Sequence, residues 1–131
     1  MSRGKPVVLV VEDEPIIRMG AVSFVADAGF EAIEADNADE AIRILEARTD
    51  IHLVFTDIGL PGTMDGLKLA HYIAGRWPPV KLVVAYGNMV VEQSQLPAGA
   101  KFFPKPYQHG AIVRALIEML SPPNRPSLSG A

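Results

Sequence analysis

Acidic side chains and one lysine follow three apolar segments of this sequence, each close to the point where the segment ends. Glu12 and Asp13 follow the first segment, Asp57 follows a later one, and Lys105 comes just after the last. Clustered carboxylates repel one another, and a hard divalent cation such as Mg²⁺ relieves that repulsion through oxygen ligands. An aspartate carboxylate also attacks phosphorus when a metal and a lysine neutralise phosphate oxygens. The pattern therefore predicts Mg²⁺-assisted transfer of a phosphoryl group onto a carboxylate.

Each of these residues also has an ordinary interpretation when it is taken alone. Acidic residues after a strand usually belong to a solvated loop, Asp57 alone could be a turn residue or a helix N-cap, and Lys105 alone could be a surface lysine. The functional interpretation is favoured because all of them fall at the same edge of one predicted fold. The three histidines show no ligand spacing, and Arg18 is interpreted as a solubilising surface charge.

The elements that must position these residues alternate between strand and helix patterns. Short apolar or β-branched runs predict five strands, over residues 7–11, 31–35, 53–56, 80–84 and 100–103. The first run is apolar throughout, which is typical of a parallel strand covered on both faces. The alternation predicts an α/β fold with a doubly wound, five-stranded parallel sheet and helices on both faces. Functional groups in such a fold gather beyond the carboxyl ends of the strands.

Apolar residues at helical spacing predict the connecting helices. The first begins at Pro15 and is expected to bury Ile17 together with later apolar residues up to Ala28. Asn37 and Glu40 resemble a capping box at the start of the second helix. Further stripes predict helices over residues 67–77 and 112–120, and a weaker pattern predicts a short helix over residues 88–95.

Composition narrows the classes of protein to consider. The chain has 131 residues, which is the size of one domain, and its 49% apolar and 21% charged content excludes a disordered chain. The absence of cysteine excludes a disulfide scaffold, a thiolate zinc site and a cysteine nucleophile. A net charge of −3 argues against binding nucleic acid through phosphate contacts. The apolar run 7–11 is too short for a signal peptide or a membrane span, so a cytoplasmic location without membrane contact is expected.

The order of motifs resembles the receiver domain of two-component response regulators. The resemblance covers about residues 6–120 and is carried by Val-Val-Glu12-Asp13-Glu14-Pro15, Phe-Thr-Asp57-Ile-Gly-Leu-Pro61, Met-Asp65-Gly66 and Phe103-Pro-Lys105-Pro106. It implies a flavodoxin-like sheet with strand order 2-1-3-4-5. It also implies a protein that takes a phosphoryl group from a sensor histidine kinase or a histidine phosphotransfer protein.

The resemblance implies a role for each matching residue. Asp57 is implied as the phosphoacceptor, and Lys105 as the residue that contacts the phosphate. Mg²⁺ is implied to bind Glu12, Asp13 and Asp57, with the backbone carbonyl of Gly59 as a further ligand. The peptide bond between Lys105 and the following proline is implied to be cis.

Two positions associated with switching depart from the family pattern, and the loop from Pro61 to Asp65 has one extra residue. Ala85 stands where the family usually has threonine or serine, and Tyr86 follows it. The aromatic switch position is Phe102, which has no hydroxyl. These departures predict a switch that is weaker or differently connected, with Tyr86 or the backbone at residues 87–88 transmitting the change.

The predicted domain organisation is a receiver domain over residues 1–120 and a disordered tail over residues 121–131, which are rich in Ser, Pro and Gly. The tail is too short for an output domain, so the expected downstream partner is another protein, and the only expected chemistry is phosphorylation and dephosphorylation of the chain itself.

Two alternatives stay open. One is a degenerate receiver that acts as a binding module. The other is a Mg²⁺-dependent phosphohydrolase with an aspartyl-phosphate intermediate, for which Gly59 stands where a second aspartate is usual.

Overall fold

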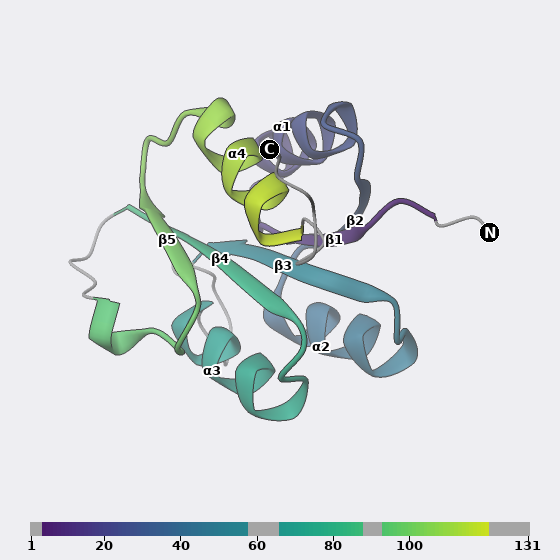
Figure 1. Ribbon diagram of the computed structural model, residues 1–131, viewed down its shortest axis with the longest axis vertical. Helices are drawn as coiled ribbons and strands as arrows, with labels where there is room; N and C mark the ends of the chain where they lie inside the picture. Colours follow the sequence, from purple (N-terminus) through teal and green to yellow (C-terminus); the bar gives the residue numbers. More distant parts are fainter. Residues whose placement is uncertain (1–3, 58–65, 88–92, 121–131) are drawn as a thin grey trace, which may run out of the picture.

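A parallel β-sheet forms the middle layer of the protein, in a computed structural model that describes residues 4–57, 66–87 and 93–120. The strand order is β2-β1-β3-β4-β5, and every neighbouring pair is parallel (Figure 1). The strands are β1 (Val7–Val11), β2 (Glu31–Ala35), β3 (Ile51–Asp57), β4 (Lys81–Tyr86) and β5 (Lys101–Pro104). The predicted fold class and strand order are therefore confirmed.

Helices cover both faces of this sheet. They are α1 (Pro15–Asp27), α2 (Ala38–Ala47), α3 (Gly66–Arg76) and α4 (His109–Leu120). The pair α1 and α4 lies on one face, and the pair α2 and α3 lies on the other (Figure 1). Of the short helix predicted over residues 88–95, the described part is the 3₁₀ turn η1 (Gln93–Gln95), and the predicted tail over residues 121–131 lies outside the described residues. No helix in the described ranges has the length and apolar content needed to cross a membrane.

The hydrophobic core is divided into two layers by the sheet. All five residues of β1 are buried, as expected for a central strand covered on both faces. Val8 and Val10 pack toward α1 and α4, whereas Leu9 and Val11 pack toward α2 and α3. This alternation follows from the two-residue period of a strand. It holds β1 firmly between two apolar layers up to the residue that precedes Glu12.

Helix α2 begins with the cap that the sequence predicted. The Asn37 side chain accepts a hydrogen bond from the Glu40 backbone N–H at 2.7 Å. In a capping box, the Glu40 carboxylate would accept from the N–H of Asn37 itself. Here it accepts instead from the N–H of Asp36 at 2.9 Å. The cap is therefore present, with its return contact shifted by one residue.

One predicted core residue of α1 is exposed. Ile17 was expected on the buried stripe, but 43% of its surface is accessible. Ala21 is buried and lines the same cavity as Val10, near the end of β1. Because α1 runs back along the strand, Ile17 lies one helical turn, about 5.4 Å, beyond Ala21 toward the carboxyl edge of the sheet. That turn extends past the apolar layer, so the prediction for Ile17 is wrong.

Candidate functional site

The predicted site residues that the structure describes lie at the carboxyl edge of the sheet. Glu12 and Asp13 follow β1, and Lys105 follows β5. Asp57 is the last residue of β3, and its backbone pairs in register with Ala85 of β4. The Asp57 side chain and all of Gly59 lie outside the described part of the structure. The backbone therefore brings the ends of β1, β3 and β5 to one edge of the sheet, as the sequence predicted.

Glu12 and Asp13 are neighbours with different surroundings. Glu12 is only 6% exposed, and its backbone N–H donates to the carbonyl of Ala35 at 3.0 Å, which continues the pairing of β1 with β2. The Glu12 carboxylate accepts a hydrogen bond from the Glu14 backbone N–H at 3.1 Å. Asp13 is exposed. The first carboxylate is thus held inside the edge of the sheet, whereas the second faces solvent.

The donor chemistry at this edge fits Mg²⁺. Two adjacent residues, Glu12 and Asp13, supply carboxylate oxygens, which are the hard ligands that Mg²⁺ prefers. Among the described side chains, which do not include that of Asp57, no three His, Cys, Asp or Glu residues form a group that could hold a metal. A complete magnesium site at this edge therefore needs further oxygen ligands beyond Glu12 and Asp13.

Lys105 is fixed beside the end of β4. Its backbone N–H donates to the carbonyl of Tyr86 at 2.6 Å, and the following peptide bond to Pro106 is cis, as predicted. A Cβ atom added to Gly87 would lie 3.4 Å from Cδ of Lys105. The aliphatic part of the lysine therefore lies against the glycine backbone. This contact keeps Lys105 on the same sheet edge as Glu12 and Asp13.

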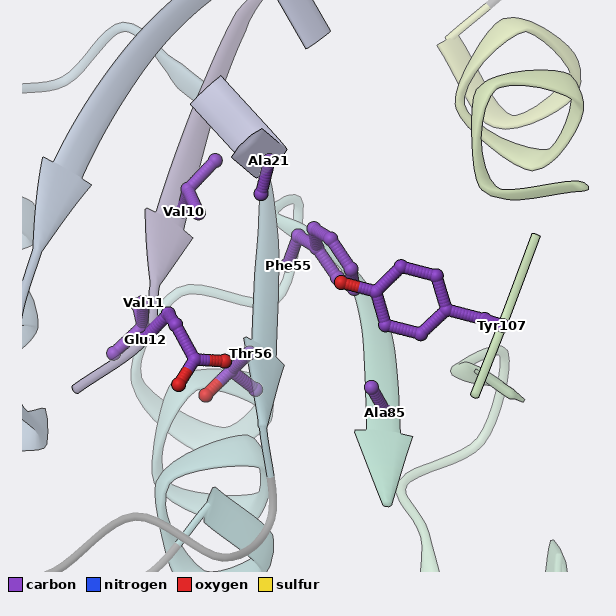
Figure 2. A pocket seen from close by; sticks show the side chains of 8 residues that line it. All are labelled: Val10, Val11, Glu12, Ala21, Phe55, Thr56, Ala85 and Tyr107. Carbon is purple, nitrogen blue, oxygen red and sulfur yellow. The ribbon is translucent and has the colours of Figure 1, made fainter. Parts of the chain in front are cut away.

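A small cavity lies next to these strand ends, between the sheet and α1. Its volume is about 10 Å³, counted as space open to the centre of a water molecule, which is room for about one water. It is lined by Val10, Val11, Glu12, Ala21, Phe55, Thr56, Ala85 and Tyr107. Glu12 and Thr56 enter from the side of β1 and β3, and Tyr107 enters from the opposite side with its hydroxyl directed inward (Figure 2).

Tyr107 is a residue of this region that the sequence analysis did not single out. Its ring packs edge-on against Phe55, with 5.7 Å between the centroids, and lies 6.4 Å from the ring of Phe24 on α1. Phe24 in turn stacks on His109 at the start of α4, with centroids 4.4 Å apart. Phe24 and Phe55 are distant from Tyr107 along the chain, so no local motif indicated these contacts.

The two aromatic residues that were predicted for the switch lie on the other face of the sheet. Tyr86 and Phe102 pack together, with ring centroids 5.5 Å apart, and belong to the layer beneath α3. Ala85 belongs to the opposite layer, beneath α1 and α4. The tyrosine that shares the cavity with Ala85 is therefore Tyr107 and not Tyr86.

Arg18 is the second residue that sequence reasoning misjudged. Its Nε donates to the Glu34 carboxylate at 2.9 Å, and its Nη1 donates to the backbone carbonyl of Glu12, also at 2.9 Å. Only 19% of the Arg18 side chain is exposed. The interpretation of Arg18 as a solubilising surface charge is therefore wrong. Its partners are 6 and 16 residues away along the chain, so no local motif indicated the contact.

Known proteins with similar sequences and structures agree with this arrangement. The family model of the response regulator receiver domain matches residues 8–117. The chain is 33% identical to sensor kinase CckA of Brucella abortus over 89% of its own length and 13% of that protein. It is 35% identical to response regulator protein FleR of Pseudomonas aeruginosa over 87% of its length and 24% of that protein. It thus spans a quarter or less of these two relatives.

A solved structure supports the same assignment. The receiver domain of NtrX from Brucella abortus is 32% identical and superposes with a TM-score of 0.78, covering 86% of this chain and 97% of that one. The family match extends over most of the chain and includes the whole sheet except Val7, the first residue of β1. The chain belongs to the response regulator receiver domain family of two-component systems.

Proposed function

We propose that this protein accepts a phosphoryl group on Asp57 from the phosphohistidine of a sensor kinase or a histidine phosphotransfer protein. The observation that supports this most strongly is the backbone position of Asp57. It ends β3 between the strand that leads to Glu12 and Asp13 and the strand beside Lys105. The nucleophile, the acidic pair and the cation therefore come to one edge of the sheet.

The proposed reaction needs little beyond position and charge. A carboxylate oxygen of Asp57 attacks phosphorus, a P–O bond forms, and the P–N bond of the donor breaks with its electron pair left on the imidazole. Glu12, Asp13, Asp57 and the carbonyl of Gly59 would hold Mg²⁺, and the ion would supply positive charge to neutralise the phosphoryl oxygens. The Lys105 ammonium contacts another phosphoryl oxygen as a point charge.

The surface of α1 supports a protein as the donor. Ile16 and Met19 are 74% and 64% exposed, and both lie within six residues of Asp13. Exposed apolar side chains beside a reactive site favour contact with another protein surface. We infer that the donor protein covers the first turns of α1 while its phosphohistidine reaches Asp57. The signal then passes to a downstream protein. The cysteine-free composition supports a cytoplasmic location.

The experiment that tests the proposal is incubation of the chain with Mg²⁺ and phosphoramidate, followed over time. We expect uptake of one phosphoryl group per chain, in an acid-labile linkage, and then slow loss. Release of many equivalents of phosphate at a steady rate would instead indicate a phosphohydrolase. No uptake, with phosphodonor and Mg²⁺ in excess, would favour the degenerate receiver that only binds a partner.

A further inference from the structure

Arg18 joins three elements through a single guanidinium group. It lies on α1, donates from Nε to Glu34 on β2, and donates from Nη1 to the carbonyl of Glu12 after β1, with both distances 2.9 Å. A planar guanidinium can make two such bonds at once because its donors are fixed in a fork. The side chain therefore connects the acidic loop to the neighbouring strand.

Glu12 is held at each of its polar groups as a result. Its N–H donates to Ala35, its carboxylate accepts from the N–H of Glu14, and its carbonyl accepts from Arg18. That carbonyl belongs to the peptide group that leads into Asp13. Because the peptide group is planar, the orientation of the carbonyl fixes the direction in which Asp13 leaves the strand.

The contact adds little to the stability of the fold. The Arg18–Glu34 pair is half open to solvent on the Glu34 side, and such pairs contribute little to folding. The guanidinium instead acts on the one loop that carries both acidic residues. We propose that Arg18 is a positioning residue that sets the geometry of Glu12 and Asp13 for Mg²⁺, an inference that rests on the proposed function.

A purely electrostatic role for Arg18 makes the opposite prediction. A positive charge beside two carboxylates disfavours binding of a cation, so removal of that charge would tighten Mg²⁺ binding. Loss of the hydrogen bond to the Glu12 carbonyl would weaken binding, because the ligands lose their arrangement. The sign of the change in affinity therefore separates the two roles.

The test compares Arg18→Gln and Arg18→Lys with the wild-type chain in titrations with MgCl₂ alone, at constant ionic strength, followed by the amide resonance of Asp13. Both variants are expected to bind Mg²⁺ about tenfold more weakly or worse, as is usual when a group that orients metal ligands is lost. Arg18→Lys keeps the charge but not the fork, so an unchanged affinity in this variant would overturn the inference. A tighter affinity in Arg18→Gln would also overturn it.

Arg48 provides the matched control. It pairs with Asp50 at 2.7 Å, just before β3 and at the opposite edge of the sheet. Arg48→Gln removes the charge and Arg48→Lys keeps it, as in the two Arg18 variants, and each breaks a similar pair. Both are expected to keep the wild-type affinity for Mg²⁺. An equal loss of Mg²⁺ affinity in the Arg48 variants would show that the loss does not depend on where the substituted arginine lies in the fold.

A second measurement excludes a structural defect as the cause. The rate of phosphorylation of Arg18→Lys is measured against Mg²⁺ concentration, and the half-saturating concentration is expected to rise about tenfold while the rate at saturation stays near wild type. A partly unfolded variant would instead lose rate at every Mg²⁺ concentration, and that result would overturn the inference. If the wild-type chain binds Mg²⁺ but takes up no phosphoryl group, the proposed function fails while the comparison of Mg²⁺ affinities still tests Arg18.

Discussion

Tyr107 and Ala85 line the same small cavity, and the tyrosine directs its hydroxyl into it (Figure 2). Ala85 contributes only a methyl group to this cavity. The polar group that enters beside it comes instead from the segment that follows Lys105. The two residues belong to the core layer beneath α1 and α4, so a change at either is expected to affect the other.

Ala85→Thr is predicted to destabilise the protein. The cavity beside Ala85 has room for about one water, and threonine adds two heavy atoms next to the Tyr107 ring. Such overpacking costs about 1–3 kcal/mol in the free energy of unfolding, measured by urea denaturation. The same substitution in a Tyr107→Ala background has space to fill and should cost less. Additive effects in this double-mutant cycle would show that the two residues do not share the cavity.

Asp13→Asn is predicted to abolish Mg²⁺ binding and phosphorylation while the fold is kept. Asp13 is exposed, so the loss of its charge leaves no buried group without a partner. The measurements are a Mg²⁺ titration and phosphoryl uptake, with thermal unfolding as the check on the fold. Asp27→Asn is the control, because Asp27 is also exposed but lies at the far end of α1. An Asp13→Asn chain with wild-type Mg²⁺ affinity contradicts the assignment of this ligand.

Lys105→Ala is predicted to keep phosphoryl uptake but to reduce the conformational response that follows it. The lysine is expected to contact an oxygen of the phosphoryl group after transfer, so uptake should continue while the conformational response shrinks. Amide shifts on addition of beryllofluoride measure that response. Lys101→Ala is the control, because Lys101 pairs with Glu118 and lies at the other end of β5. A full set of distant shifts in Lys105→Ala would remove the lysine from the switch.

Asn37→Ala is predicted to weaken the start of α2 without a direct effect on chemistry. The Asn37 side chain accepts from the Glu40 N–H at 2.7 Å, and loss of such a cap costs about 0.5–2 kcal/mol. Asn37→Asp keeps an acceptor and should restore most of the loss in urea denaturation. Equal instability of the two variants would show that another property of the asparagine side chain matters.

The sequence predicted the bounds of two strands correctly, the fully buried β1 and the partly exposed β2. Residues 7–11 and 31–35 were predicted with the bounds that the structure shows for β1 and β2. The start of β3 was placed late because His52 is polar and exposed, yet it belongs to the strand and its Nδ1 accepts a hydrogen bond from the Val7 N–H at 3.0 Å. A run of apolar residues does not indicate a strand position that is occupied by a polar residue. Here a hydrogen bond to the neighbouring strand satisfies that polar side chain.

The site was predictable to the extent that it depends on strand ends. The acidic pair and Lys105 could be placed because parallel strands end at one edge. Arg18 and Tyr107 could not, because their roles depend on Glu34 and Phe55, which become neighbours only when the chain folds. Side chains that act through such distant contacts have no signature at short range in the sequence.

Phosphorylation of Asp57 is the central claim, and intact mass measurement tests it most directly. The wild-type chain and Asp57→Asn are each incubated with a small phosphodonor, with Mg²⁺ and with Mg²⁺ removed by a chelator. The account predicts that the wild-type chain gains the mass of one phosphoryl group only when Mg²⁺ is present, and that Asp57→Asn gains none. A phosphoryl group on Asp57→Asn, or equal uptake by the wild-type chain without Mg²⁺, would contradict it.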